Sequence, residues 1–171
     1  MSDSPMQRGQ QWLKTLLLFT GVSTEVSGDL EPAQPQDGDS QEPDNYWLTI
    51  DETNLTPEQI RVLIGSDGSV LDAIQYLANS VLNLNQPPEG QASYTIELNG
   101  YRIKRQAEIR ALAEAASEEV RTTGREVEIK SLSSAERRQI HTFLKEFGDL
   151  ETFSRGKEPH RHLVVRQLTR E

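Results

Sequence analysis

Residues 133–147 read SSAERRQIHTFLKEF, a pattern that predicts an amphipathic helix. Ser133 and Glu136 have the spacing of a capping box, so the helix is expected to start here. At about 100° per residue one stripe collects the apolar side chains, Ile140, Phe143, Leu144 and Phe147. A flank of that stripe collects the basic ones, Arg137, Arg138, His141 and Lys145. This flank predicts a nucleic-acid ligand, and the alternative is a set of solvated charges on an ordinary helix.

The residues on either side of this helix predict a small β-α-β-β domain over 125–171. Strands are expected at 126–129, 150–153 and 162–168, the last two forming a hairpin around 155–157. Arg161 and Arg166 belong to this hairpin, and we expect them to extend the cationic track from the helix.

Upstream, residues 10–100 predict a second domain of mixed helices and strands. Its expected elements are a helix over 10–20, strands at 22–26 and 46–51, a helix from Pro57, a helix over 70–82 and a strand at 94–98. The segment 28–45 is rich in Pro, Gly and acidic residues, and it is expected to be a flexible acidic loop. An Ala-rich helix over 101–124 is expected to connect the domains, with Ile109, Leu112, Ala113, Ala116 and Val120 facing inward. The predicted fold class is therefore α+β.

A Gly-x-x-Gly sequence, Gly65-Ser66-Asp67-Gly68, separates two of the predicted helices. Glycines at these positions would let backbone amides approach a phosphate without an intervening Cβ. The alternative is a tight turn between helices, in which Ser66 or Asp67 caps the second one. The Asp67 carboxylate would also repel a phosphate, at a cost on the order of a kcal/mol before screening.

Charge is divided unevenly along the chain, whose net charge is −9. Residues 1–100 contain three Lys or Arg against 15 Asp or Glu, whereas residues 101–171 contain 15 against 12. A polyanion is therefore expected to bind through the second part, with an affinity that falls as salt is added. The chain has no cysteine, its longest apolar run is too short to cross a bilayer, and no signal peptide is evident, so a soluble, cytoplasmic protein is expected.

Catalytic and metal-binding patterns are weak in this sequence. We find no nucleophile with a neighbouring base and no phosphate-binding loop, so the chain is not expected to be an enzyme. His160, His162 and Glu158 would be the candidate metal ligands, but a fourth ligand is missing, and neither a metal nor a cofactor is expected.

The order of elements over 10–99, with Gly65–Gly68 between two helices, resembles a type II KH domain. Residues 125–171 resemble the small single-strand nucleic-acid-binding domain named for its Arg-xxx-His motif, which Arg137 and His141 match. Residues 124–128 and 158–166 strengthen that match. Together the two domains resemble the bacterial Jag (KhpB-type) RNA-binding proteins. The resemblance implies a KH-like αββααβ domain joined by a long helix to a βαββ domain, with RNA held by the Gly-x-x-Gly loop and the Arg-xxx-His helix.

Two hypotheses about function follow from the residues and the resemblance. The first is a non-enzymatic protein that binds single-stranded RNA, or single-stranded DNA, as a post-transcriptional regulator or RNA chaperone. The alternative is an adaptor whose acidic KH-like domain docks a partner, such as a small KH-domain protein, and binds nucleic acid weakly. Membrane insertion is not expected under either hypothesis.

Overall fold

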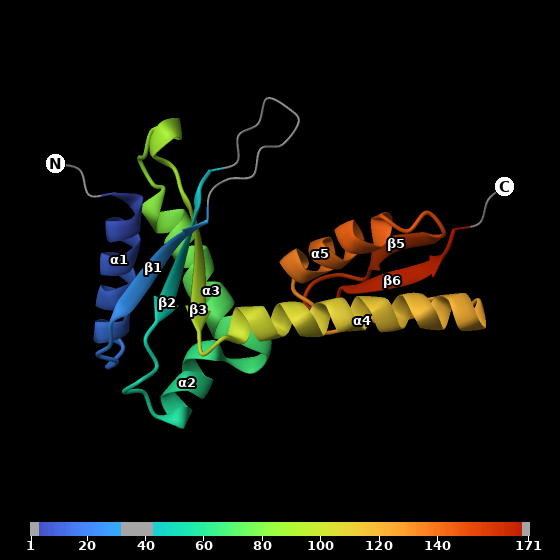
Figure 1. Cartoon of the computed structure of the whole chain (residues 1–171), viewed down its shortest axis with the longest axis horizontal. Coiled ribbons are helices and arrows are strands. Elements are labelled where there is room, and N and C mark those ends of the chain that lie inside the picture. Colours follow the sequence, from blue (N-terminus) through green and yellow to red (C-terminus); the bar gives the residue numbers. More distant parts are fainter. Residues whose placement is uncertain (1–3, 32–42, 169–171) are drawn as a thin grey trace. The chain divides into compact units, whose positions relative to one another are not determined.

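The computed structural model describes residues 4–31 and 43–168. The chain divides into two compact units, Met1–Arg102 and Ile103–Glu171, and each combines helices with a three-stranded sheet (Figure 1). The predicted α+β class is therefore confirmed.

The first unit contains α1 (Pro5–Phe19), β1 (Val26–Glu31), β2 (Asn45–Ile50), α2 (Pro57–Ile64), α3 (Ser69–Leu82) and β3 (Ser93–Leu98). Two short 3-10 turns, η1 (Ser66–Gly68) and η2 (Pro88–Gly90), lie on either side of α3. The predicted αββααβ order is confirmed. β2 lies in the middle of the sheet, antiparallel to β1 and parallel to β3.

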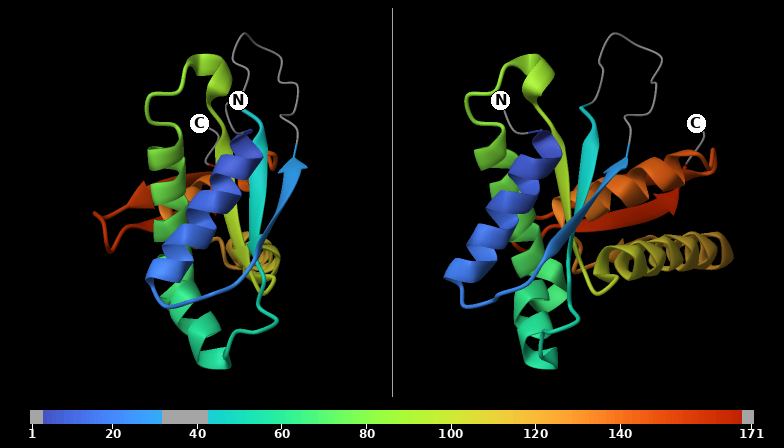
Figure 2. Two further views of the ribbon diagram at one scale, coloured as in Figure 1. Left: turned by 90° about the vertical axis from the view of Figure 1, so that its left-hand side faces the viewer. Right: turned by 60° about the vertical axis from the view of Figure 1, so that its left-hand side comes forward.

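Helices α1 and α3 lie on one face of this sheet, as both views in Figure 2 show. The core between the layers is aliphatic with one buried tyrosine, and its fully buried side chains include Leu13, Leu17, Leu48, Ile50, Leu71, Tyr94, Ile96 and Leu98. Burial raises the pKa of Tyr94, whose hydroxyl donates to the Pro5 carbonyl oxygen at 3.0 Å.

Three amide side chains of α3 and its C-terminal end form hydrogen bonds with the backbone of β3 and the residue just before it. Asn83 donates to the Ala92 carbonyl at 2.7 Å and accepts from the Ala92 amide at 2.8 Å. Asn79 does the same with Tyr94, at 2.8 and 2.9 Å, and Gln75 accepts from the Ile96 amide at 3.0 Å. These amide residues recur every four positions and meet every second residue of the strand, so helix and strand periodicities match.

Two boundaries in this unit differ from the prediction. Helix α1 starts at Pro5 rather than residue 10, because Ser4 and Gln7 form a capping box and Pro5 occupies the first turn. The strand expected at 22–26 begins at Val26 and continues to Glu31, so residues 28–31 and Asn45 belong to strands rather than to the predicted flexible loop. The segment 32–42 of that loop lies outside the described residues.

Side-chain pairing across the hairpin accounts for the longer β1. Glu31 accepts hydrogen bonds from Asn45 Nδ2 at 2.9 Å and from Trp47 Nε1 at 2.8 Å. The Trp47 bond, followed by the Asn45 bond, lowers the pKa of Glu31. Such cross-strand contacts outweigh the low strand propensity of Gly28 and Asp29.

The second unit contains most of α4 (Tyr101–Thr123), followed by β4 (Val127–Ile129), α5 (Ser134–Lys145), β5 (Leu150–Arg155) and β6 (His162–Gln167). Its sheet has the order β4-β6-β5 and is antiparallel throughout, which confirms the predicted β-α-β-β arrangement. Ile109, Ala113, Ala116 and Val120 of α4 pack into a core with α5 and the sheet. Leu112, which was expected to face inward, is 42% exposed.

Candidate nucleic-acid interface

Arg137 is buried, contrary to its expected place on the exposed flank of α5. Its residue is 5% exposed. Nη1 donates to the carbonyl oxygens of Leu132 at 2.8 Å and Arg161 at 3.1 Å, while Nη2 donates to Ser134 Oγ at 3.0 Å and pairs with Glu158. The physical reason is that these acceptors all belong to the fold itself, so the guanidinium is satisfied without solvent or ligand.

Arg138, His141 and Lys145 do lie on the exposed part of α5. His141 Nδ1 forms a hydrogen bond with the Thr152 hydroxyl of β5. Arg161, just before β6, is also exposed.

These elements surround a hollow of about 370 Å³, which we call the basic hollow. Its lining residues include Ser134, Arg137, Arg138 and His141 from α5, Thr152 and Ser154 from β5, and Arg161. The two β5 hydroxyls were not among the predicted site residues. Their spacing of two along a predicted strand was the available signal, because such residues share one face of a sheet.

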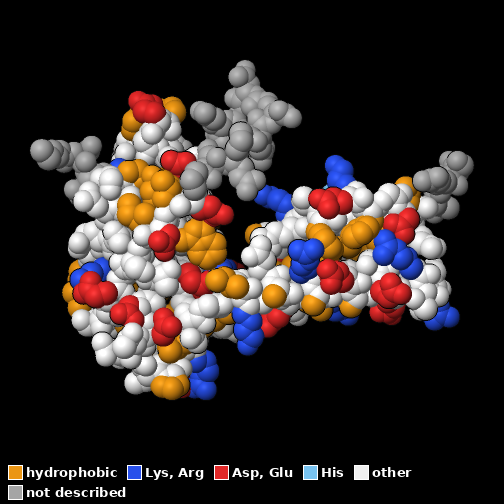
Figure 3. Space-filling view, in the orientation of Figure 1, with side chains coloured by type: hydrophobic (Ala, Val, Ile, Leu, Met, Phe, Trp, Pro, Cys, Tyr) orange, Lys and Arg blue, Asp and Glu red, His pale blue; other side chains and the backbone are white. Residues whose placement is uncertain are grey.

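The basic hollow stands out by its unpaired cations. Six arginines of the second unit form salt bridges: Arg105, Arg110, Arg121, Arg137, Arg155 and Arg166. Among the described arginines of this unit, Arg125, Arg138 and Arg161 form none, and the last two line the hollow. On the face shown in Figure 3, Lys and Arg are spread over the second unit, whereas Asp and Glu predominate over the first.

Arg166 does not join the basic hollow. Leu163 and Val165 point into the core, so strand alternation turns Arg166 to the other face of the sheet. There Arg166 Nε donates to Glu151 at 2.8 Å, and its guanidinium lies 5.0 Å from the centre of the Phe153 ring. The expected extension of the track from Arg161 to Arg166 is therefore wrong.

Tight packing accounts for both glycines of the 65–68 turn. Gly65 and Gly68 have φ angles of 75° and 77°. A Cβ on Gly65 would lie 2.6 Å from Val70 Cγ2, and one on Gly68 would lie 2.6 Å from Tyr101 Cε1. Neither Ser66 nor Asp67 caps α3, since Gly68 is its N-cap residue and no side-chain cap bond is present. Asp67 is exposed and adopts a left-handed backbone with φ of 51°.

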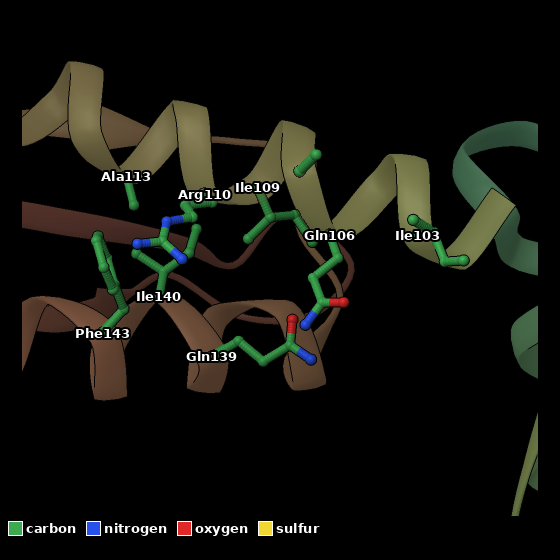
Figure 4. Close-up of a pocket in the computed structure, with 9 residues that line it drawn as sticks. Ile103, Gln106, Ile109, Arg110, Ala113, Gln139, Ile140 and Phe143 are labelled. Carbon is green, nitrogen blue, oxygen red and sulfur yellow. The ribbon is translucent and has the colours of Figure 1, made fainter. Parts of the chain in front are cut away.

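A second hollow of the same unit, about 400 Å³, lies between α4 and α5 (Figure 4). Ile103, Ile109, Ala113, Ile140 and Phe143 make it mainly apolar. The cation that lines it, Arg110, pairs with Glu114 at 3.3 Å and lies 5.2 Å from the centre of the Phe143 ring. Phosphate is therefore better matched by the basic hollow.

The predicted histidines are not arranged as a metal site. His162 Nε2 lies 3.3 Å from Glu128 Oε1, and His160 is exposed in the preceding loop. Within residues 4–31 and 43–168, no group of three His, Asp or Glu side chains is placed to hold a metal ion. In the same ranges no helix combines the length and apolar character needed to cross a membrane.

Comparison with known proteins places this geometry in a family context. Residues 107–167 match the model of the domain family named for its Arg-xxx-His motif. The chain is 35% identical over 121 residues to the RNA-binding protein KhpB of Lactiplantibacillus plantarum, covering 71% of this chain and 36% of that protein. It is 31% identical over 114 residues to KhpB of Bacillus subtilis, covering 66% of this chain and 54% of that protein.

KhpB of Clostridium symbiosum is 32% identical over 112 residues, covering 66% of this chain and 50% of the relative. The alignments therefore span from about a third to about half of these curated relatives. They agree with the motifs and the fold: the chain is related to the KhpB-type RNA-binding proteins, and its second unit contains an Arg-xxx-His domain.

Proposed function

We propose that this chain binds single-stranded RNA through the basic hollow of its second unit. The observation that carries the proposal is the convergence of two unpaired arginines, Arg138 and Arg161, on one hollow beside exposed His141. A guanidinium donates to phosphate or stacks on a base, and imidazole stacks on unpaired bases. Lys145, one turn beyond His141, would extend the track by one phosphate. The names of the KhpB relatives support the same ligand.

Such a protein would act without catalysis, as a post-transcriptional regulator or RNA chaperone. Contacts made through charge and stacking do not select a base sequence, which suits a chaperone that meets many strands. Single-stranded DNA is the competing ligand. Because the hydroxyls of Thr152 and Ser154 lie in the hollow, a preference for RNA through the 2′-hydroxyl is expected.

The test is a titration of a fluorescein-labelled single strand followed by anisotropy, at several salt concentrations. Arg138→Gln and Arg161→Gln should each weaken binding by about three- to tenfold at low salt and reduce the salt slope by about 0.7. Arg125→Gln is the matched control, because Arg125 is also exposed and free of salt bridges but does not line the hollow. Equal losses in all three variants would remove the hollow from consideration.

A second candidate function is supported by the first unit. Its helix α3 exposes Tyr76, Leu77 and Val81, and its Gly65–Gly68 turn carries an acidic residue and no basic one. These features favour a protein-docking module whose partner is a small KH-domain protein. Co-purification of such a partner by the parent, and its loss with Leu77→Ser, would support this role. Retained binding of the same partner by Leu77→Ser would exclude this face.

A further inference from the structure

Arg137 connects two parts of the second unit that border the basic hollow. One part is the start of α5, where its guanidinium binds the Leu132 carbonyl at 2.8 Å and Ser134 Oγ at 3.0 Å. The other is the loop between β5 and β6, where it binds the Arg161 carbonyl at 3.1 Å and pairs with Glu158. One buried cation therefore holds the loop against the helix at two points.

The burial of Arg137 separates it from the exposed cations. Its side chain is 6% exposed, whereas that of Glu158 is 56% exposed. To reach a phosphate, the guanidinium would have to leave the Leu132 carbonyl, and an unpaired buried carbonyl costs about 1–3 kcal/mol. The Arg161 side chain carries no such constraint, because its backbone oxygen makes the contact and its guanidinium forms no salt bridge.

We infer that Arg137 is a positioning residue for RNA: it fixes the Glu158–Arg161 segment so that the Arg161 side chain stands at the rim of the basic hollow. The inference deepens the proposed function and rests on it. The competing interpretation is direct contact, in which RNA phosphate displaces Glu158 from Arg137. The two interpretations assign opposite roles to the Glu158 carboxylate, which either supports binding or competes with RNA.

Substitutions of Glu158 therefore separate the interpretations by the sign of their effect. If Arg137 positions the loop, Glu158→Ala weakens RNA binding by about threefold even though it removes a negative charge, and Glu158→Gln, which keeps an acceptor oxygen, falls between it and the parent. If Arg137 contacts phosphate directly, both variants bind more tightly than the parent. Glu146→Ala is the control, because it removes an exposed carboxylate of the same unit that forms no salt bridge.

The experiment measures single-strand RNA affinity by anisotropy for the full-length parent, the two Glu158 variants, the control and Arg161→Gln. Glu158→Ala combined with Arg161→Gln completes a double-mutant cycle. We expect the double variant to bind no more weakly than Arg161→Gln alone, because the loop acts through Arg161. Far-UV circular dichroism at the assay temperature verifies that each variant is folded.

Three results would overturn the inference while leaving the proposed function in place. These are tighter binding by Glu158→Ala, binding equal to that of the parent, and additive losses in the cycle. If the folded parent binds no single strand at low salt, the proposed function fails and the inference fails with it. If Arg138→Gln weakens binding while Glu158→Ala strengthens it, RNA uses the hollow and Arg137 contacts the phosphate.

Discussion

The Arg137 guanidinium is a buried cation surrounded by four protein acceptors: two carbonyls, one hydroxyl and one carboxylate. Removing a buried cation of this kind leaves its acceptors unpaired, and that penalty exceeds the loss of the contacts themselves. Arg137 therefore contributes to the stability of the second unit as well as to the shape of its surface.

We predict that Arg137→Met lowers the free energy of unfolding of the second unit by about 2–4 kcal/mol. Arg138→Met, an exposed neighbour with the same charge change, should stay within about 0.5 kcal/mol of the parent. Both tryptophans, Trp12 and Trp47, belong to the first unit, so their fluorescence reports that unit while far-UV circular dichroism reports both. A shift in the fluorescence transition equal to the shift in dichroism would contradict the assignment.

Helix geometry predicted the neighbourhood of Arg137 but not its burial. Residues seven apart share a helix face, so the alignment of Arg137 with buried Leu144 was readable from the sequence. Its partners Glu158 and Arg161 come from a loop more than 20 residues away, and no local pattern predicts that approach. Arg138 and His141, which depend on the helix alone, were correctly expected to be exposed.

At the scale of elements, α4 is fastened to the loop before β5 by Arg121 and Asp149. Arg121 Nε donates to Asp149 Oδ2 at 2.8 Å and Nη2 to Oδ1 at 3.1 Å. The bond from Arg121 holds the pKa of Asp149 below its usual value. A carboxyl whose pKa is lowered by folding stabilises the protein above its unfolded-state pKa of about 3.9, and loses that contribution as the pH falls through the folded value.

We therefore predict that Asp149→Asn lowers the melting temperature at pH 7 and flattens its decline below about pH 4. Dichroism melts at pH 7, 4 and 3 compare this variant with Glu119→Gln, an exposed acidic residue of α4 that forms no salt bridge. Parallel melting curves for Asp149→Asn and the parent across this pH range would show that the Arg121 pair contributes nothing to acid sensitivity.

The Gly65–Gly68 turn calls for a substitution that changes charge without changing backbone preference. Asp67 has φ of 51°, a region that asparagine tolerates and lysine adopts less readily. We predict that Asp67→Asn strengthens RNA binding by about twofold at low salt, because it removes a repelled carboxylate. Ser66→Ala serves as the uncharged control in the same anisotropy assay. An unchanged affinity for Asp67→Asn would take the turn off the RNA path and favour the docking role of the first unit.

Most elements of both units were predictable from periodicity and capping residues. Thr56 with Gln59 and Ser133 with Glu136 form the capping boxes that start α2 and α5. The β1 strand was misplaced because its stability comes from pairing with β2, and Gly28 and Asp29 disfavour strands when read alone.

For the whole molecule, an excess of acidic groups in residues 1–100 opposes the approach of RNA to the second unit. Replacing residues 32–42 with Asn-Gly removes Asp37, Asp39 and Glu42 and changes the net charge from −9 to −6. Keeping 28–31 and Asn45 preserves the paired strands, which a replacement of 28–45 would remove. We predict that RNA association accelerates by about twofold at low salt and that the difference disappears at high salt.

Stopped-flow anisotropy measures that rate, and the tryptophan fluorescence melt verifies that the first unit is intact. Replacing the same residues with a neutral segment of equal length is the control for charge alone. Slower association with Asn-Gly but not with the neutral segment would indicate that the length of the segment matters to binding.

The amides of Gln75, Asn79 and Asn83 occupy the side of β3 where a fourth strand would otherwise add. An unprotected sheet edge recruits strands from other chains, the first step of β-aggregation and of strand swapping. Here Ala92, Tyr94 and Ile96 already have amide partners within their own unit. Their backbone protons should exchange with deuterium as slowly as those of an interior strand, and Asn79→Ala should speed that exchange while making the protein prone to fibril formation.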